Sequence, residues 1–158
     1  MSEETLSVTL RIPAKAEAVF AVLTEPGTHP AIDGTGWVAA ARETAPITET
    51  GQVFRMRMYH PNHPDGHYEM ANRVEVLDPP WAITWQPGQD VAGSDELQFG
   101  GWTYGYRLAP ADDGGTDVTL TYDWSAVPAF IREYISFPPF APDHLENSLR
   151  NLAGLVTG

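Results

Sequence analysis

The chain has no cysteine, a single lysine and no long hydrophobic run. Without cysteine it cannot form disulfides, thiolate metal sites or a cysteine nucleophile, which is compatible with a reducing compartment. Nine basic residues stand against twenty-one acidic ones, for a net charge of −12. Such a charge repels phosphate-rich partners and anionic membranes. We therefore expect no nucleic-acid binding.

The N-terminus, MSEETLSVTL, has neither the basic flank nor the apolar core of a signal peptide, and no segment approaches transmembrane length. These features predict a cytoplasmic protein with no membrane insertion. A length of 158 residues, with 42% apolar and 19% charged residues, is typical of one globular domain. We take that domain to span residues 1–158.

The clearest helical pattern ends the chain, in PDHLENSLRNLAGLV from Pro142 to Val156. Its large apolar residues recur every three or four positions and so share one stripe: Leu145, Leu149, Leu152 and Val156. A solitary amphipathic helix needs an apolar surface to cover, and the strands that precede it could provide one. We expect the stripe to meet a sheet and to border any gap that remains between them.

The start of the chain predicts a strand followed by short helices. Apolar and polar residues alternate from Leu6 to Ile12, which is the period of a strand with one buried face. Apolar residues then fall at helical spacing from Ala16 to Leu23, before Pro26 and Gly27 end the run. One further helical turn fits between His29 and Asp33.

The middle of the chain predicts six more strands in an antiparallel meander, separated by turn residues. We place these strands near Trp37–Thr44, Phe54–Met58, Tyr68–Val76, Trp81–Trp85, Trp102–Leu108 and Val118–Trp124. A long acidic loop is expected from Pro87 to Gly100.

One face of these strands is rich in aromatic and methionine side chains. The alternation places on it Phe54, Met56, Met58, Tyr68, Met70, Trp85, Trp102, Tyr104, Tyr106, Tyr122 and Trp124. Methionine adapts to irregular shapes, while tyrosine and tryptophan join an apolar body to one polar group. Such a mixture suits a flat, partly oxygenated ligand. The alternative is that these rings fill the core against the last helix.

Asn72 is the most informative polar residue on this face, because it lies between Met70 and Val74. A buried amide must find hydrogen-bond partners, and a ligand oxygen is one candidate. A neighbouring tyrosine hydroxyl or an ordered water is the other.

The order of elements resembles that of the START/Bet v 1-like (SRPBCC) superfamily, in particular its polyketide cyclase/dehydrase-like branch. The motifs that carry the resemblance are VFAVLTEP, HPAIDG, NRVEVLDPPWAITW and GGTDVTLTYDWS. It implies an α+β helix-grip fold, in which a curved, seven-stranded antiparallel sheet wraps around a long C-terminal helix, with one or two short helices between the first two strands. Members include lipid carriers, plant ligand binders, aromatic cyclases and a co-chaperone-like branch, so the fold alone does not select a function.

We therefore expect a small hydrophobic ligand, aromatic, polyketide-like or lipid-like, in a cavity between the sheet and the last helix. The residues expected to bind it are Phe54, Met56, Met58, Tyr68, Met70, Asn72, Trp85, Trp102, Tyr104, Tyr122, Leu145, Leu149 and Leu152. One alternative is a polyketide cyclase or dehydratase that uses the same cavity, with catalytic residues unassigned. A weaker alternative is a co-chaperone-like interaction module.

Three histidines, His60, His63 and His67, could together hold zinc. Prolines and a Gly-containing turn instead make this segment a hairpin loop, and no carboxylate stands at a spacing that would orient the imidazoles. We predict no metal. The Gly34-Thr35-Gly36 stretch precedes a strand, whereas a dinucleotide-binding loop follows one, so we expect no cofactor.

Two further segments leave alternatives open. His29 and Asp33 could meet on one helical turn as an acid–base pair, although Asp33-Gly34 also reads as a turn and His29 as a helix start. The segment from Val127 to Ala141 could be a lid, a subunit interface or a plain connector whose apolar residues cover the end of the sheet. A homodimer is therefore left open.

Overall fold

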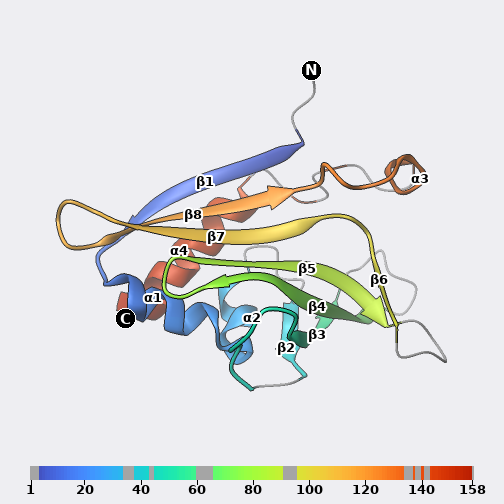
Figure 1. Ribbon diagram of the computed structural model, residues 1–158, viewed down its shortest axis with the longest axis horizontal. Helices are drawn as coiled ribbons and strands as arrows, with labels where there is room; N and C mark the ends of the chain where they lie inside the picture. Colours follow the sequence, from blue (N-terminus) through green and yellow to red (C-terminus); the bar gives the residue numbers. More distant parts are fainter. Residues whose placement is uncertain are drawn as a thin grey trace.

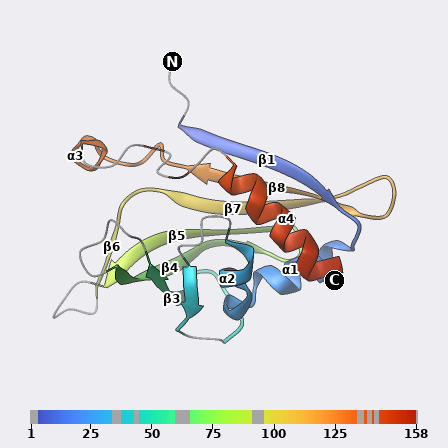
Figure 2. The same ribbon diagram turned by 180° about the vertical axis from the view of Figure 1, so that it is seen from behind.

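The computed structural model describes residues 4–33, 38–42, 45–59, 66–90, 96–133, 137, 140 and 143–157. A curved antiparallel sheet forms one layer, and the helices α1, α2 and α4 cover one of its faces (Figures 1 and 2). The strands are β1 (Thr5–Ile12), β2 (Val38–Ala41), β3 (Val53–Tyr59), β4 (His67–Asp78), β5 (Ala82–Asp90), β6 (Leu97–Phe99), β7 (Thr103–Pro110) and β8 (Thr116–Asp123). The helices are α1 (Ala16–Leu23), a 3-10 turn η1 (Pro26–Thr28), α2 (His29–Ile32), α3 (Ala129–Arg132) and α4 (His144–Thr157).

The sheet has the strand order β1-β8-β7-β5-β4-β3-β2, with β6 paired to β5 outside this path. The predicted helix-grip fold is therefore confirmed, including the short helices between the first two strands. The described part of the chain holds eight strands where seven were expected, because β6 lies within the predicted acidic loop.

The prediction of a loop from Pro87 to Gly100 was wrong at both ends of that segment. Strand β5 continues to Asp90, and β6 pairs with it through Gly88 and Phe99. The Phe99 ring lies against the backbone of Gly88, where an added Cβ would stand 2.6 Å from a ring carbon. The absence of a side chain at Gly88 permits this contact. The alternation of apolar and polar residues in the sequence does not reveal it.

Two large apolar residues at the ends of predicted strands, Val76 and Trp81, are exposed. Val76 is 43% exposed because the register of β4 against β5 shifts between Val74 and Val76, and such an irregularity turns the following side chains to the other face. Trp81 is 40% exposed because it lies in the turn before β5.

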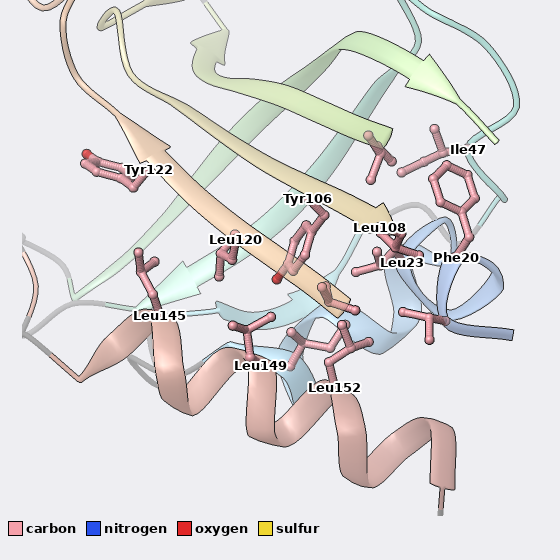
Figure 3. Packing of buried hydrophobic residues seen from close by; sticks show 14 of the residues in the cluster. Phe20, Leu23, Ile47, Tyr106, Leu108, Leu120, Tyr122, Leu145, Leu149 and Leu152 are labelled. Atoms are coloured by element: carbon pink, nitrogen blue, oxygen red, sulfur yellow. The ribbon is translucent and has the colours of Figure 1, made fainter. Parts of the chain in front are cut away.

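The leucine stripe of α4 is the contact that joins helix and sheet. Leu145, Leu149 and Leu152 are fully buried, and Figure 3 shows their side chains pointing from the helix toward β8 and its neighbours. Helix α4 packs against β1, β8, α1 and α2. The predicted meeting of stripe and sheet is thus observed, while Val156 is only partly buried at the edge of the core.

The opposite face of the sheet carries polar pairs across neighbouring strands. Ser7 and Thr9 of β1 hydrogen-bond Thr121 and Thr119 of β8. On the same strand pair, Arg11 donates to Asp117 over 2.8 Å. Because these polar residues pair on the exposed face, the apolar residues that alternate with them on β1 and β8 face α4.

Helix α3 follows β8 after a short connection, and none of its residues is buried. Phe130 is 62% exposed, whereas Phe140 further along is buried in the core. The three alternatives for the segment from Val127 to Ala141, a lid, a subunit interface or a plain connector, stay open. In the described part of the chain, no helix is long and apolar enough to cross a membrane.

Replacing Leu149 by Ala should lower the free energy of unfolding by about 2–5 kcal/mol, because it leaves a void where the helix meets the sheet. Leu155→Ala on the same helix is the matched control, since Leu155 is 42% exposed. We expect a change within about 0.5 kcal/mol for the control. Urea unfolding of both variants measures the difference, and equal effects would contradict the assigned packing.

Candidate functional site

A cavity of about 270 Å³ lies where the sheet and the helices do not close on one another. Small-molecule sites typically measure about 300–1,000 Å³, so this cavity suits a compact ligand of one or two rings. Its lining is formed by Leu23, His29, Ile32, Asp33, Val38, Phe54, Met56, Met58, Tyr68, Met70, Asn72, Trp85, Pro87, Trp102, Tyr104, Tyr106, Leu120, Tyr122, Phe137, His144 and Ser148. The lining is therefore mostly apolar, with polar groups at a few positions.

The register of β3 against β4 builds one wall of the cavity. Met56 lies opposite Met70, and Met58 lies opposite Tyr68. Because side chains of directly opposed residues point to the same face, both pairs project into the cavity together. This wall is adaptable, since methionine has three rotatable bonds.

A second part of the lining is made of aromatic rings in contact with one another. The Trp85 ring stacks on His29 at 5.2 Å between centroids and on Tyr104 at 6.3 Å. Tyr104 in turn contacts Tyr122 at 4.9 Å. Trp102 contacts Phe137, a residue of the segment after α3. Packed rings hold one another in place, so this wall offers rigid flat surfaces to a ligand.

Most of the residues expected to bind a ligand come together at this cavity. Ten of them line it: Phe54, Met56, Met58, Tyr68, Met70, Asn72, Trp85, Trp102, Tyr104 and Tyr122. Leu145, Leu149 and Leu152 do not, because they are buried in the core against the sheet. Their contribution is to position the helix, and the ligand-binding role of the set stays a prediction.

Asn72 is buried, as its place between Met70 and Val74 predicts. Its Nδ2 donates a hydrogen bond to the carbonyl oxygen of Phe54, 3.3 Å away on β3. The partner is thus a backbone carbonyl and not a tyrosine hydroxyl. The amide remains part of the cavity wall, where a ligand could still contact it.

His29 and Asp33 both line the cavity, but each has a separate main partner. His29 Nε2 lies 2.9 Å from the carbonyl oxygen of Leu23. A carbonyl only accepts, so this nitrogen carries the proton and donates. Burial lowers the pKa of His29, and the hydrogen bond to Leu23 opposes that effect only in part. His29 is therefore a neutral ring that supports Trp85.

Asp33 faces a second histidine, His144, at the first turn of α4. Asp33 Oδ1 lies 4.0 Å from His144 Nδ1, and Asp33 Oδ2 accepts a hydrogen bond from the backbone N–H of Val38 at 2.9 Å. Among the buried side-chain polar atoms of the described residues, His144 Nδ1 is the one without a hydrogen-bond partner. The distance to Asp33 is too long for a hydrogen bond, but it is short enough for the carboxylate to act on the dipole of the neutral imidazole.

The other nitrogen of His144 meets Tyr104, whose hydroxyl oxygen lies 3.4 Å from Nε2. Burial raises the pKa of Tyr104 well above its ordinary value, and the charge of Asp33 adds to the effect. Tyr104 is thus protonated at neutral pH. Burial also lowers the pKa of His144, against the opposing charges of Asp33 and Asp143. The cavity therefore has a polar end made of Asp33, His144, Tyr104 and Ser148.

His144 and Ser148 were not singled out from the sequence. They stand four residues apart and directly before Leu145 and Leu149, so they occupy the helix face next to the buried stripe. That spacing was readable in PDHLENSL. The sequence does not show that this neighbouring face of the helix borders a cavity and not solvent.

The predictions for His60 and His63 lie outside the described residues, as does the side chain of His67. Within the described part of the chain, no group of three or more His, Asp or Glu side chains could hold a metal ion.

No protein-family model matches the chain, and no curated protein matches it by sequence. Solved structures do match it. Protein Ms6760 from Mycobacterium smegmatis aligns with a TM-score of 0.68 at 16% identity, over 98% of this chain and 91% of that one. CV1439 from Chromobacterium violaceum aligns with a TM-score of 0.67 at 21% identity, over 98% of both chains.

The major latex-like protein 151 from Panax ginseng aligns with a TM-score of 0.63 at 14% identity, over 98% of this chain and 97% of that one. At such identities the likeness concerns the fold alone. Together with the strand order and the position of α4, it shows that the chain has a Bet v 1-like fold.

Lowering the pH from 7.5 to 5.5 should destabilise the protein, because His29 and His144 have lowered pKa values in the folded state. In the unfolded state each imidazole has a pKa of about 6.5. As the pH falls below that value, the unfolded state therefore binds protons that the folded state does not yet bind. Stability is full above this window and falls within it, by up to about 1.4 kcal/mol per pH unit for each histidine. Urea unfolding at several pH values measures the slope.

His144→Phe should reduce this slope, since one of the two imidazoles is removed. The carboxylates of Asp90 and Asp117 have pKa values lowered by hydrogen bonds from arginine side chains. They therefore affect the stability only below about pH 4, outside the range of the histidines. A stability independent of pH between 7.5 and 5.5 would contradict the assignment of both buried histidines.

Proposed function

We propose that the protein binds a small, hydrophobic, aromatic molecule in the cavity between the sheet and α4. The observation that carries the proposal is the lining itself, which joins rigid rings such as Trp85 and Trp102 to the three adaptable methionines of β3 and β4. Flat ligands stack on such rings, and methionines adjust to their outline.

The energetics are sufficient for measurable binding. Burying about 300 Å² of apolar ligand surface contributes around 7 kcal/mol before the costs of association. The lining has no lysine or arginine among the described residues, and the chain carries a net charge of −12. A neutral ligand therefore fits this cavity better than an anionic one.

Filling part of the cavity should weaken binding. Naphthalene is a suitable probe because it presents two fused apolar rings. Met58→Trp, which places a larger side chain on the cavity wall, should weaken naphthalene binding at least about tenfold in isothermal titration calorimetry, since the ligand then has to displace or avoid the new ring. Leu155→Trp on the exposed side of α4 is the matched control and should bind as the wild type does.

The proposal fails if naphthalene and a diverse library of hydrophobic compounds leave the melting temperature unchanged, and if native mass spectrometry of protein from its own host shows no bound small molecule. Equal binding by wild type and Met58→Trp would place the ligand elsewhere.

The second candidate is a proton-transfer enzyme of the cyclase or dehydratase type that uses the same cavity. The neighbouring side chains of Asp33, His144 and Tyr104 favour it, because a buried neutral imidazole beside a carboxylate can accept a proton. Its test is turnover of a poly-β-ketone substrate that is lost in His144→Phe while naphthalene binding is retained. Turnover that persists in this variant would remove His144 from such a mechanism.

A further inference from the structure

The polar end of the cavity presents one hydrogen-bond donor and one acceptor side by side. Tyr104 keeps its proton at neutral pH, so its hydroxyl can donate. His144 is neutral and carries one proton on its ring. The carboxylate of Asp33 lies on the Nδ1 side, 4.0 Å away, and attracts that proton to Nδ1. His144 Nε2 is then an acceptor, directed at Tyr104.

The contact between these two groups is weak. Tyr104 Oη and His144 Nε2 are 3.4 Å apart, longer than the about 2.7–3.2 Å of a good hydrogen bond. A ligand can therefore take over both partners with little loss of an existing interaction. The group that satisfies both must accept from Tyr104 and donate to His144.

Functional groups differ in their ability to do so. A hydroxyl accepts and donates through one oxygen, whereas a ketone or an ether only accepts and an ammonium only donates. A carboxylate cannot donate either, and it would meet the negative charge of Asp33, which adds to the effect of burial in raising the pKa of Tyr68, Tyr104 and Tyr106. The described lining offers no lysine or arginine to compensate such a charge.

We propose that the polar end is a recognition site for a neutral ring hydroxyl, that of a phenol or an enol, which donates to His144 Nε2 and accepts from Tyr104. The rings of the ligand then lie along Trp85 and the methionine wall. This assignment rests on the proposed function, because it names the class of ligand that the same cavity takes. Packing of His144 against Phe140, at 4.5 Å between ring centroids, keeps the imidazole in place for this contact.

The test compares ligands of the same shape that differ in one group. The probes are 2-naphthol, naphthalene, 2-methoxynaphthalene and 2-naphthoate, and calorimetry at pH 7.5 gives their affinities. We expect 2-naphthol to bind about tenfold tighter than naphthalene, although it is the more polar of the two. The methoxy compound should lose this advantage because it cannot donate, and the naphthoate should bind most weakly.

Two variants locate the preference. His144→Phe keeps a ring and removes the acceptor, and Tyr104→Phe removes a single oxygen, so each should bring 2-naphthol to the affinity of naphthalene or below it. Met58→Leu is the control, because it changes only the apolar wall and should alter both affinities by the same factor. Melting temperatures establish that each variant is folded.

A measurement on the wild type makes the result independent of the variants. In ¹⁵N NMR, 2-naphthol should shift the Nε2 resonance of His144, and naphthalene should leave it in place. If naphthalene binds but 2-naphthol shows no advantage, or if the advantage persists in His144→Phe, the hydroxyl site is refuted while the cavity assignment stands. If neither probe binds, the proposed function fails and the hydroxyl site with it.

Discussion

The burial of Leu145, Leu149 and Leu152 against the sheet is the contact on which the rest of the structure depends. It fixes α4 beside β1 and β8, so that the sheet curves around the helix along one side only. Away from this contact, the sheet continues through β5, β4 and β3, where the short helix α2 places His29 against Trp85, and the cavity lies beside these strands. The same packing that stabilises the fold therefore leaves this cavity beside the helix.

The helix also sets the chemistry of the cavity. His144 and Ser148 occupy the face of α4 adjacent to the leucines, so the core contact that orients the leucines orients these polar groups as well. His144 then lies between Asp33, at the end of α2, and Tyr104 of β7. Three elements far apart in the sequence thus supply the polar groups at one end of a mostly apolar cavity, which is how binding sites usually obtain orientation and selectivity.

Much of this was predictable from the sequence, since alternation and helical spacing report directly on which side chains are buried. They placed Phe54, Met56 and Tyr104 on the concave face and the leucine stripe against the sheet. They did not reveal that Val76 is exposed, because a register shift between strands leaves no periodic pattern in the sequence. They did not reveal β6 either, because its pairing with β5 is made by backbone groups. The pairing of Asp33 with His144 was equally hidden, because contacts between distant elements depend on how those elements pack and not on local spacing.

We propose a ligand site in the space between the sheet and α4. Methyl NMR of protein labelled at methionine and leucine tests it most directly, because Met56, Met58 and Met70 line the cavity and Leu155 is exposed on the far side of the helix. With naphthalene added, ring currents should shift the three methionine signals and leave that of Leu155 in place. Unchanged methionine signals, with shifts confined to Leu155 or other exposed methyl groups, would show that naphthalene binds outside the cavity.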